Sequence, residues 1–326
     1  MNPTLRQVIL KRTVALCDLV LAPLTLFAAL LLKSLRRAGV ARTPVSRAIF
    51  RRVGMFPIID HYYEPRFDYR RLIRPLAAER ELPGIDWNVD EQLALLARFG
   101  YNAELERFPR ERTDDGSFYY NNGNFGAGDA EILYSMIRTF KPARLVEIGA
   151  GFSTLMAHNA IARNQSEQPG YACEHVCIEP YEMPWLDNLP GVTVLRGRVE
   201  ESGKAQYAKL AANDILFIDS SHIIRPQGDV LFEYLEVLPA LRPGVLVHVH
   251  DVFSPRDYPA AWLVDEVKFW NEQYLLEAFL SLNRSYKVIA ALNYLFHHRR
   301  DELLAHCPVL RQMPAFEPGS FWIVRM

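Results

Sequence analysis

The chain has 326 residues, half of them hydrophobic and 23% charged, which is the composition of a folded globular protein and excludes wholesale disorder. Its four cysteines are too few for a disulfide scaffold of this length. Residues 1–80 carry 15 basic and 5 acidic side chains, whereas the rest carries 22 and 33. A basic N-terminal segment on an acidic body predicts an anionic partner for that segment.

An apolar run at residues 14–32 lies within this basic segment and is long enough to cross a bilayer. Asp18 and Pro23 interrupt it, since a charge opposes insertion and a proline removes a helical hydrogen bond. Lysine and arginine flank both ends, whereas a simple span carries them mainly on its cytoplasmic side. These flanks favour a kinked, re-entrant or interfacial segment with both ends in the cytoplasm. A signal peptide is the competing interpretation, but no small-residue cleavage site follows the run.

A second amphipathic stretch follows the apolar run. Val45, Ile49 and Val53 share one face of a predicted helix, and Arg47 and Arg51 lie away from that face. Such a helix suits an anionic lipid surface, and packing against the protein's own body is the alternative. We therefore expect an anionic membrane surface, and not nucleic acid, to be the partner of the basic segment.

The chain is expected to have three parts. Residues 1–54 are assigned to membrane association. Residues 55–128 are assigned to a connector and cap, which begins rich in proline and arginine and contains a predicted helix at residues 89–99. Residues 129–326 are assigned to a catalytic domain.

From residue 129 onward, apolar strands alternate with helices. Helices are predicted over residues 130–139 and 155–163. Strands are predicted over residues 144–148, 175–179, 192–195, 214–219, 245–250, 287–292 and 321–325. This alternation predicts a mostly parallel α/β sheet that binds ligands at the carboxyl ends of its strands.

A glycine turn follows the first of these strands. Gly149 and Gly151 allow the backbone to turn sharply and a ligand to approach closely, next to the positive end of a helix. Thr154 stands where a dinucleotide fingerprint has its third glycine, which disfavours NAD or FAD. Glu179 ends the second strand, where a carboxylate can bind the two hydroxyls of a ribose.

The ordered set of motifs resembles the class I S-adenosylmethionine (SAM)-dependent methyltransferases. Within them it is similar to the metal-dependent O-methyltransferase branch, which includes macrolide-sugar O-methyltransferases and cephalosporin-hydroxylase-like proteins. The resemblance covers about residues 118–326 and implies a Rossmann-like, seven-stranded, mostly parallel sheet with an antiparallel last strand. Its motifs lie at residues 145–154, 179, 214–222, 241–251 and 319–325.

The resemblance also implies roles for individual residues. Gly149, Gly151 and Ser153 would line the methionine end of SAM, with Glu147 near the methionine amine. Glu179 would hold the ribose hydroxyls. The adenine would lie near residues 198–199, and Asp219 would touch the cofactor from the next strand.

Acids and histidines gather at the ends of two strands that should be neighbours. In the resembling enzymes the acid at the place of Asp219 binds a divalent metal, and the histidine at the place of His222 is the general base. An acidic pair ends the next strand in those enzymes, where this chain has His250 and Asp251. We expect Asp219 and Asp251 as ligands of a divalent cation, magnesium or manganese; the loss of one oxygen donor counts against magnesium and leaves manganese open. His250 is a second candidate base, and a site without metal is the alternative.

These expectations together predict a SAM-dependent O-methyltransferase on the cytoplasmic side of a membrane, because SAM is a cytoplasmic cofactor. Its acceptor is expected to be a hydroxyl of a glycan, glycolipid or lipid-linked intermediate. A non-catalytic module of the same fold that tethers an assembly at the membrane is one alternative. A metal-dependent hydrolase is another, although the spacing from His248 to Asp251 does not match hydrolase motifs.

Overall fold

The computed structural model describes residues 3–114, 116–313 and 315–326, with residues 3–8 described by their backbone alone. The chain divides into two compact units, Met1–Ile73 and Arg74–Met326. The boundary falls inside the segment that we assigned to the connector and cap.

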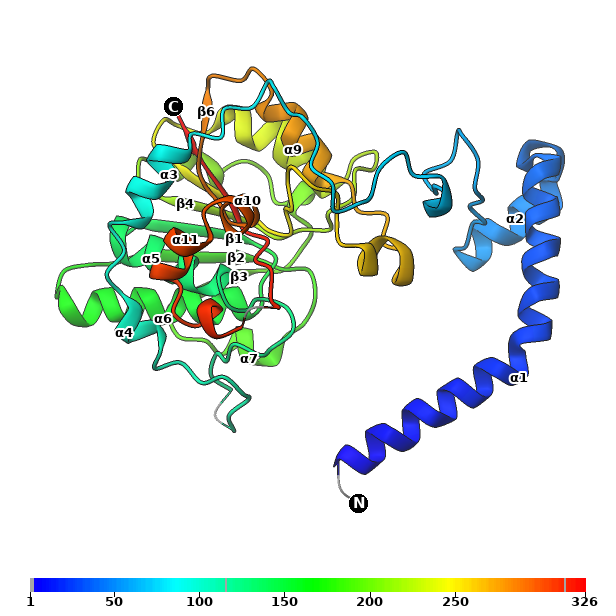
Figure 1. Ribbon diagram of the computed structural model, residues 1–326, viewed down its shortest axis with the longest axis horizontal. Helices are drawn as coiled ribbons and strands as arrows, with labels where there is room; N and C mark the ends of the chain where they lie inside the picture. Colours follow the sequence, from blue (N-terminus) through cyan, green and yellow to red (C-terminus); the bar gives the residue numbers. More distant parts are fainter. Residues whose placement is uncertain (1–2, 115, 314) are drawn as a thin grey trace. The chain divides into compact units, whose positions relative to one another are not determined.

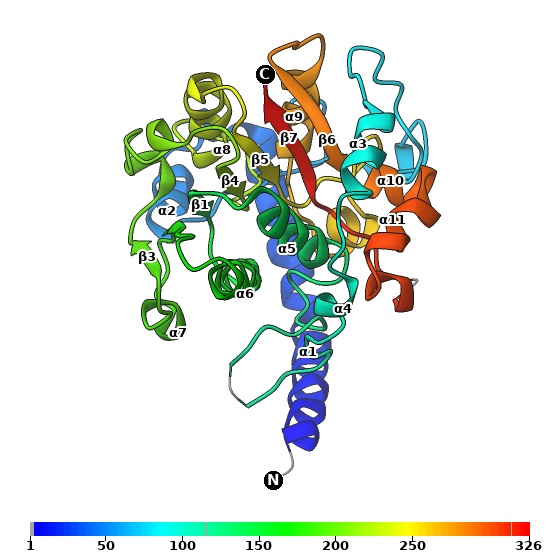
Figure 2. The same ribbon diagram turned by 90° about the vertical axis from the view of Figure 1, so that its left-hand side faces the viewer.

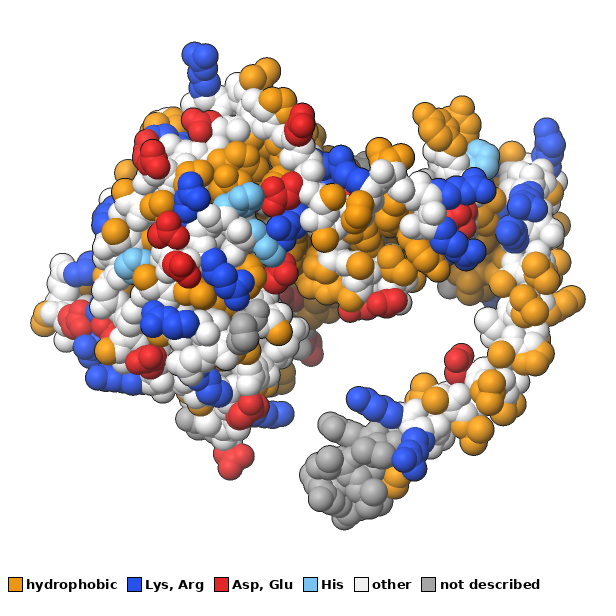
Figure 3. Space-filling view, in the orientation of Figure 1, with side chains coloured by type: hydrophobic (Ala, Val, Ile, Leu, Met, Phe, Trp, Pro, Cys, Tyr) orange, Lys and Arg blue, Asp and Glu red, His pale blue; other side chains and the backbone are white. Residues whose placement is uncertain are grey.

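The first unit is built on one long helix, α1 (Pro3–Ala38), which contains Pro23 and is bent part-way along (Figure 1). The stretch Ile9–Ala38 is long and apolar enough to cross a membrane, and none of its apolar window is buried. Figure 3 shows many hydrophobic side chains along its visible surface, together with a few charged ones. The bend fits the expected kink, and the placement of the segment in or on a membrane stays a prediction.

The rest of the first unit folds back on the end of α1. The short helix α2 (Pro44–Val53) ends at Gly54, whose φ of 75° is the left-handed conformation that stops a helix. Arg36, in the last turn of α1, forms an ion pair with Glu64 and lies over the ring of Phe56. These contacts join the segment after α2 to the end of α1.

The second unit is a seven-stranded sheet with the order β3-β2-β1-β4-β5-β7-β6. Strands β1 to β5 are parallel, and β7 is antiparallel to both of its neighbours. The expected fold class, with its antiparallel last strand, is confirmed. The strands are β1 (Arg144–Ile148), β2 (Glu174–Ile178), β3 (Val192–Leu195), β4 (Ile215–Ile218), β5 (Leu246–Val249), β6 (Tyr286–Ala291) and β7 (Phe321–Arg325).

Helices cover both faces of this sheet (Figure 2). Alternate residues of a strand point to opposite faces, so Leu145 joins one hydrophobic core and Val146 joins the other. The first core is closed by α3 (Val89–Leu96), α4 (Asn102–Leu105), α5 (Asp129–Phe140), α6 (Phe152–Glu167), α10 (Leu292–His298) and α11 (Arg300–His306). The second is closed by α8 (Asp229–Phe232) and α9 (Glu272–Leu280). The short helix α7 (Pro184–Asp187) packs beside β3.

The division into units predicts that residues 74–326 form a stable protein when produced alone. This shortened protein should stay in the supernatant without detergent and bind SAM within about twofold of the full chain, since both cores lie within it. The full chain should need detergent for extraction, and salt alone should not release it, because α1 binds by burying apolar surface. Fractionation and calorimetry check both results. A full chain that is soluble without detergent would contradict the membrane association.

Candidate active site

The site lies at the carboxyl edge of the parallel strands, around a cavity of about 350 Å³. Residues that follow β1, β2, β3 and β4 line it, because parallel strands end at the same edge of a sheet. Gly149 and Glu179 lie in the lining, as do the residues expected near adenine. The lining residues are Ile148, Gly149, Ile178, Glu179, Pro180, Tyr181, Arg198, Val199, Glu200, Asp219, Ser220, Ser221, Arg225 and Asp229.

Gly149 is required by a close contact between β1 and β4. Its φ is 79°, and a Cβ atom there would lie 2.1 Å from the carbonyl oxygen of Asp219. Gly151 differs, because no atom lies within 4 Å of the place of its Cβ, and it begins α6 in an extended conformation. The structure therefore requires glycine at position 149 and leaves room for a side chain at position 151.

Glu179 is almost fully buried and holds the glycine turn. One carboxylate oxygen accepts a hydrogen bond from the backbone N–H of Ala150 at 3.1 Å, and the other accepts from Tyr181 at 2.8 Å. The side chain is thus fixed at the wall of the cavity, between the turn and the end of β2.

Glu147 and Ser153 lie outside the lining of the cavity. The Ser153 hydroxyl donates to Glu147 at 2.5 Å, and the other oxygen of Glu147 lies 3.1 Å from Nε2 of His175 and 3.3 Å from Sγ of Cys177. All four side chains are buried. The expected roles of Glu147 and Ser153 at the methionine end of SAM remain predictions.

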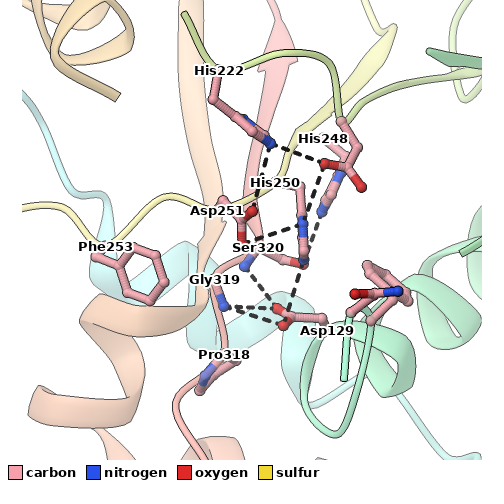
Figure 4. Close-up of polar contacts among 12 residues, drawn as sticks. Asp129, His222, His248, His250, Asp251, Phe253, Pro318, Gly319 and Ser320 are labelled. Carbon is pink, nitrogen blue, oxygen red and sulfur yellow. Dashed lines mark hydrogen bonds and ion pairs between the residues drawn. The ribbon is translucent and has the colours of Figure 1, made fainter. Parts of the chain in front are cut away.

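The expected acids and histidines do come together, and Figure 4 shows His222, His250 and Asp251 turned toward one another. Nε2 of His222 lies 3.2 Å from Asp219 and 3.5 Å from Asp251. Nδ1 of His250 lies 3.6 Å from Asp219 and 3.5 Å from Asp251. Asp219 belongs to this cluster and also to the cavity lining. His222 and Asp251 both have φ values near 60°, a left-handed conformation that is uncommon for residues other than glycine.

Glu272 completes the surroundings of His222 and was not found from the sequence. Its carboxylate lies 2.8 Å from Nδ1 of His222, and the backbone N–H groups of Asn271 and Glu272 donate to the His222 carbonyl. Tyr234 donates to the other oxygen of Glu272, and Trp270 packs on the His222 ring with 4.4 Å between centroids. The start of α9 therefore fixes both the backbone and the ring of His222, and turns Nε2 toward the two aspartates.

The charges of the cluster are strongly coupled. Burial favours neutral His222, but the hydrogen bonds and charges of Asp219 and Glu272 outweigh it and raise the pKa of His222 to about 10. Burial also opposes ionisation of Asp219, yet His250 and His222 hold its pKa well below the usual range. The pKa of His250 is raised, against burial, by Asp251 and Asp219. Burial raises the pKa of Asp251.

His248 has a different environment from His250. It lies in the core of the sheet, stacked on Phe217 at 4.0 Å, and its Nε2 is 2.8 Å from the Ser320 hydroxyl. Burial, followed by the charge of His250, lowers the pKa of His248 well below its usual value. His248 is therefore a neutral packing residue. His250 reaches the other side of the cluster, where Asp129 lies 3.8 Å from its Nε2.

A divalent cation fits the donor set of the cluster. Ligand atoms of Asp219, His222 and Asp251 all lie within 4.8 Å of one another. The contact between Glu272 and Nδ1 leaves Nε2 of His222 for a ligand, as in metal sites where a carboxylate orients the histidine. Two carboxylates and an imidazole suit manganese better than magnesium. The geometry adds His222 to the two expected metal ligands. Its Nε2 atom could then either bind the metal or act as the base, but not both at once.

Comparison with known proteins agrees with the glycine turn and the strand ends described above. Residues 146–252 match the model of a family described as a methyltransferase domain. This part of the chain is similar to a methyltransferase domain. It contains the glycine turn, Glu179 and the whole cluster except Glu272 and Asp129.

Other similarities to the chain are more distant. An uncharacterized protein of Archaeoglobus fulgidus is 31% identical over 147 residues, and the match covers 43% of this chain and 65% of that protein. The O-methyltransferase from Bacillus cereus, solved with SAH, is 14% identical with a TM-score of 0.36, over 73% of this chain and 91% of that one. The O-methyltransferase TomG from Streptomyces achromogenes, solved with SAM, is 13% identical with a TM-score of 0.35, over 71% and 89%.

The two glycines that follow β1 provide a matched test of the turn. Gly149→Ala should lower the free energy of unfolding by more than about 2 kcal/mol, because alanine is strained at this φ and its Cβ meets a backbone oxygen. Gly151→Ala should cost less than about 1 kcal/mol, since its Cβ has free space. Denaturant unfolding of residues 74–326 measures both values. Equal costs would contradict the close contact between Gly149 and Asp219.

Proposed function

We propose that this protein transfers the methyl group of SAM to a hydroxyl group of an acceptor. The position of Asp219 carries the proposal, because this residue lines the cavity behind the glycine turn and also contacts both candidate bases. A cofactor in the cavity and a hydroxyl beside the histidines would then meet at one carboxylate. The match to a methyltransferase domain supports the cofactor.

Methyl transfer to oxygen requires a place for the acceptor's proton. The hydroxyl oxygen attacks the methyl carbon, the carbon–sulfur bond of SAM breaks, S-adenosylhomocysteine leaves, and the proton passes to a base. His222 is the candidate base, and His250 is the second. A divalent cation held by Asp219 and Asp251 would lower the pKa of the hydroxyl and oppose protonation of His222. Without it, a pKa of about 10 keeps His222 protonated near neutral pH.

The acceptor that we propose is a glycan, a glycolipid or a lipid-linked intermediate. A second cavity, of about 370 Å³, lies beyond the end of β5 and offers an aromatic ring at Trp262 together with Asp257, Asn293 and Glu317. Planar polar groups and an aromatic ring suit the hydroxyls and the apolar faces of a sugar. The exposed apolar α1 supports a membrane location, with the domain on the cytoplasmic side where SAM is available. Mass spectrometry of cell-envelope glycans with and without the protein should reveal a difference of one methyl group.

The cofactor position is tested by replacing Glu179. Glu179→Ala should weaken SAM binding about tenfold or more, because the ribose hydroxyls lose a charged acceptor. Glu182→Ala removes a nearby exposed carboxylate outside the cavity lining and should leave affinity unchanged. Calorimetry on the folded variants measures both constants. An unchanged affinity in Glu179→Ala would show that the ribose lies elsewhere.

The catalytic assignments are tested in two steps. His222→Ala should lower turnover by roughly 10²–10⁴ and change SAM affinity little, because a base acts on the acceptor. Asp251→Asn should abolish Mn²⁺ binding as measured by electron paramagnetic resonance, whereas Glu266→Gln, outside the cluster, should preserve it. A chelator that leaves the wild type fully active would favour a metal-free mechanism. An active His222→Ala variant would instead point to His250.

A further inference from the structure

The first unit contains a pocket of about 360 Å³ between α2 and the segment that follows it. Its walls are mostly apolar, and Phe50 and Phe56 pack edge to face with 6.1 Å between their centroids. Arg36 lies over Phe56 and pairs with Glu64, which ties this wall to the end of α1. The lining residues are Val40, Arg47, Phe50, Arg51, Gly54, Met55 and Phe56.

The pocket has positive charge without any acid of its own. Arg47 and Arg51 lie one turn apart on α2 and both line it, and like charges at this spacing repel each other. Within the described residues, neither guanidinium has an ion-pair partner, and α2 contains no acidic residue. Two unpaired guanidiniums beside apolar walls favour an anion, and phosphate oxygens match their geometry.

The surroundings of the pocket distinguish a lipid from a free anion. Val45, Ile49 and Val53, on the other face of α2, are 54–73% exposed, as an interfacial helix requires. Tyr62 and Tyr63 are at least 85% exposed, and tyrosine is enriched where membranes meet water. The unit as a whole has 13 basic and 4 acidic residues and is continuous with the apolar α1. Free phosphate would use the arginines but leave the apolar walls without a partner.

We propose that this pocket binds the phosphate headgroup of an anionic lipid, with Arg47 and Arg51 on the phosphate and the apolar walls on the adjoining acyl region. The site gives the first unit a specific lipid contact in addition to the insertion of α1. It rests on the proposed membrane association and is independent of methyl transfer.

The test uses the full chain in dodecyl maltoside with dioctanoyl phosphatidic acid as the probe, followed by thermophoresis. The wild type should bind this lipid, and equal concentrations of inorganic phosphate or dioctanoyl phosphatidylcholine should not displace it. Arg47→Gln and Arg51→Gln should each weaken binding about tenfold, as expected for losing a charge-assisted hydrogen bond. Met55→Ser should weaken binding of the lipid through the apolar wall.

Arg52→Gln is the matched control, because Arg52 lies on the same helix but not in the pocket lining. Its affinity should stay within about twofold of the wild type. An equal loss in Arg52→Gln would show diffuse attraction and overturn the site, as would no binding at all. Full displacement by inorganic phosphate would make it a site for a free anion. SAM affinity, measured on the same samples, reports separately on the catalytic proposal.

Discussion

The contact between Gly149 and the carbonyl of Asp219 determines the geometry of the whole site. It brings the end of β1 against the end of β4 more closely than any side chain would allow. The backbone N–H of Asp219 donates to Ile148 in the same place, so the two strand ends are held by a bond as well as by packing. The turn that shapes the cofactor cavity therefore also places the first acid of the cluster. A change at Gly149 would disturb the cavity and the acid–histidine cluster together.

A second constraint acts from outside the sheet edge. The start of α9 bonds the backbone of His222 through two N–H groups and its ring through Glu272. The left-handed conformation of His222 is unfavourable by itself, and these contacts supply the compensation. The unusual backbone conformations of His222 and Asp251 are held in place by hydrogen bonds. The start of α9 bonds the carbonyl of His222, and the residues on both sides of Asp251 donate backbone hydrogen bonds to Ile218 and Gly319. The cluster is preorganised before any substrate arrives.

The sequence was sufficient for the sheet because strands in an α/β domain are short apolar runs with clear ends. The predicted strands over residues 144–148, 192–195 and 321–325 agree with β1, β3 and β7 at both ends. Asp219, His222, His250 and Asp251 could be grouped because neighbouring parallel strands end together. Glu272 could not, since it lies 50 residues beyond His222 on a helix whose approach depends on tertiary packing.

The same limit applied to the first unit of the chain. The amphipathic pattern of α2 was visible in the sequence, but the pocket beside it was not. That pocket depends on how the segment after Gly54 turns back, and on the contact of Arg36 with both Phe56 and Glu64. The extent of the first unit, through Ile73, likewise depends on such contacts and not on composition.

The charges around His222 affect two possible states of the site, one with a protonated His222 and one with a bound divalent cation. Three carboxylates, of Asp219, Asp251 and Glu272, face one imidazole, and the charged ring is favoured although it is buried. Since its pKa rises from 6.5 to about 10, the resulting stabilisation is full below pH 6.5 and is lost as pH rises through 10. The proton on Nε2 lies between the two aspartates, where a divalent cation would also take its ligands. A proton and a divalent cation therefore compete for the same position beside Nε2 of His222. The two aspartates that keep His222 protonated, and so make it a poor base, are also the residues that would attract the metal. The contact with Glu272 is compatible with both states, because it engages Nδ1 of His222. Nε2 is then the ring atom left to carry the proton or to bind the cation.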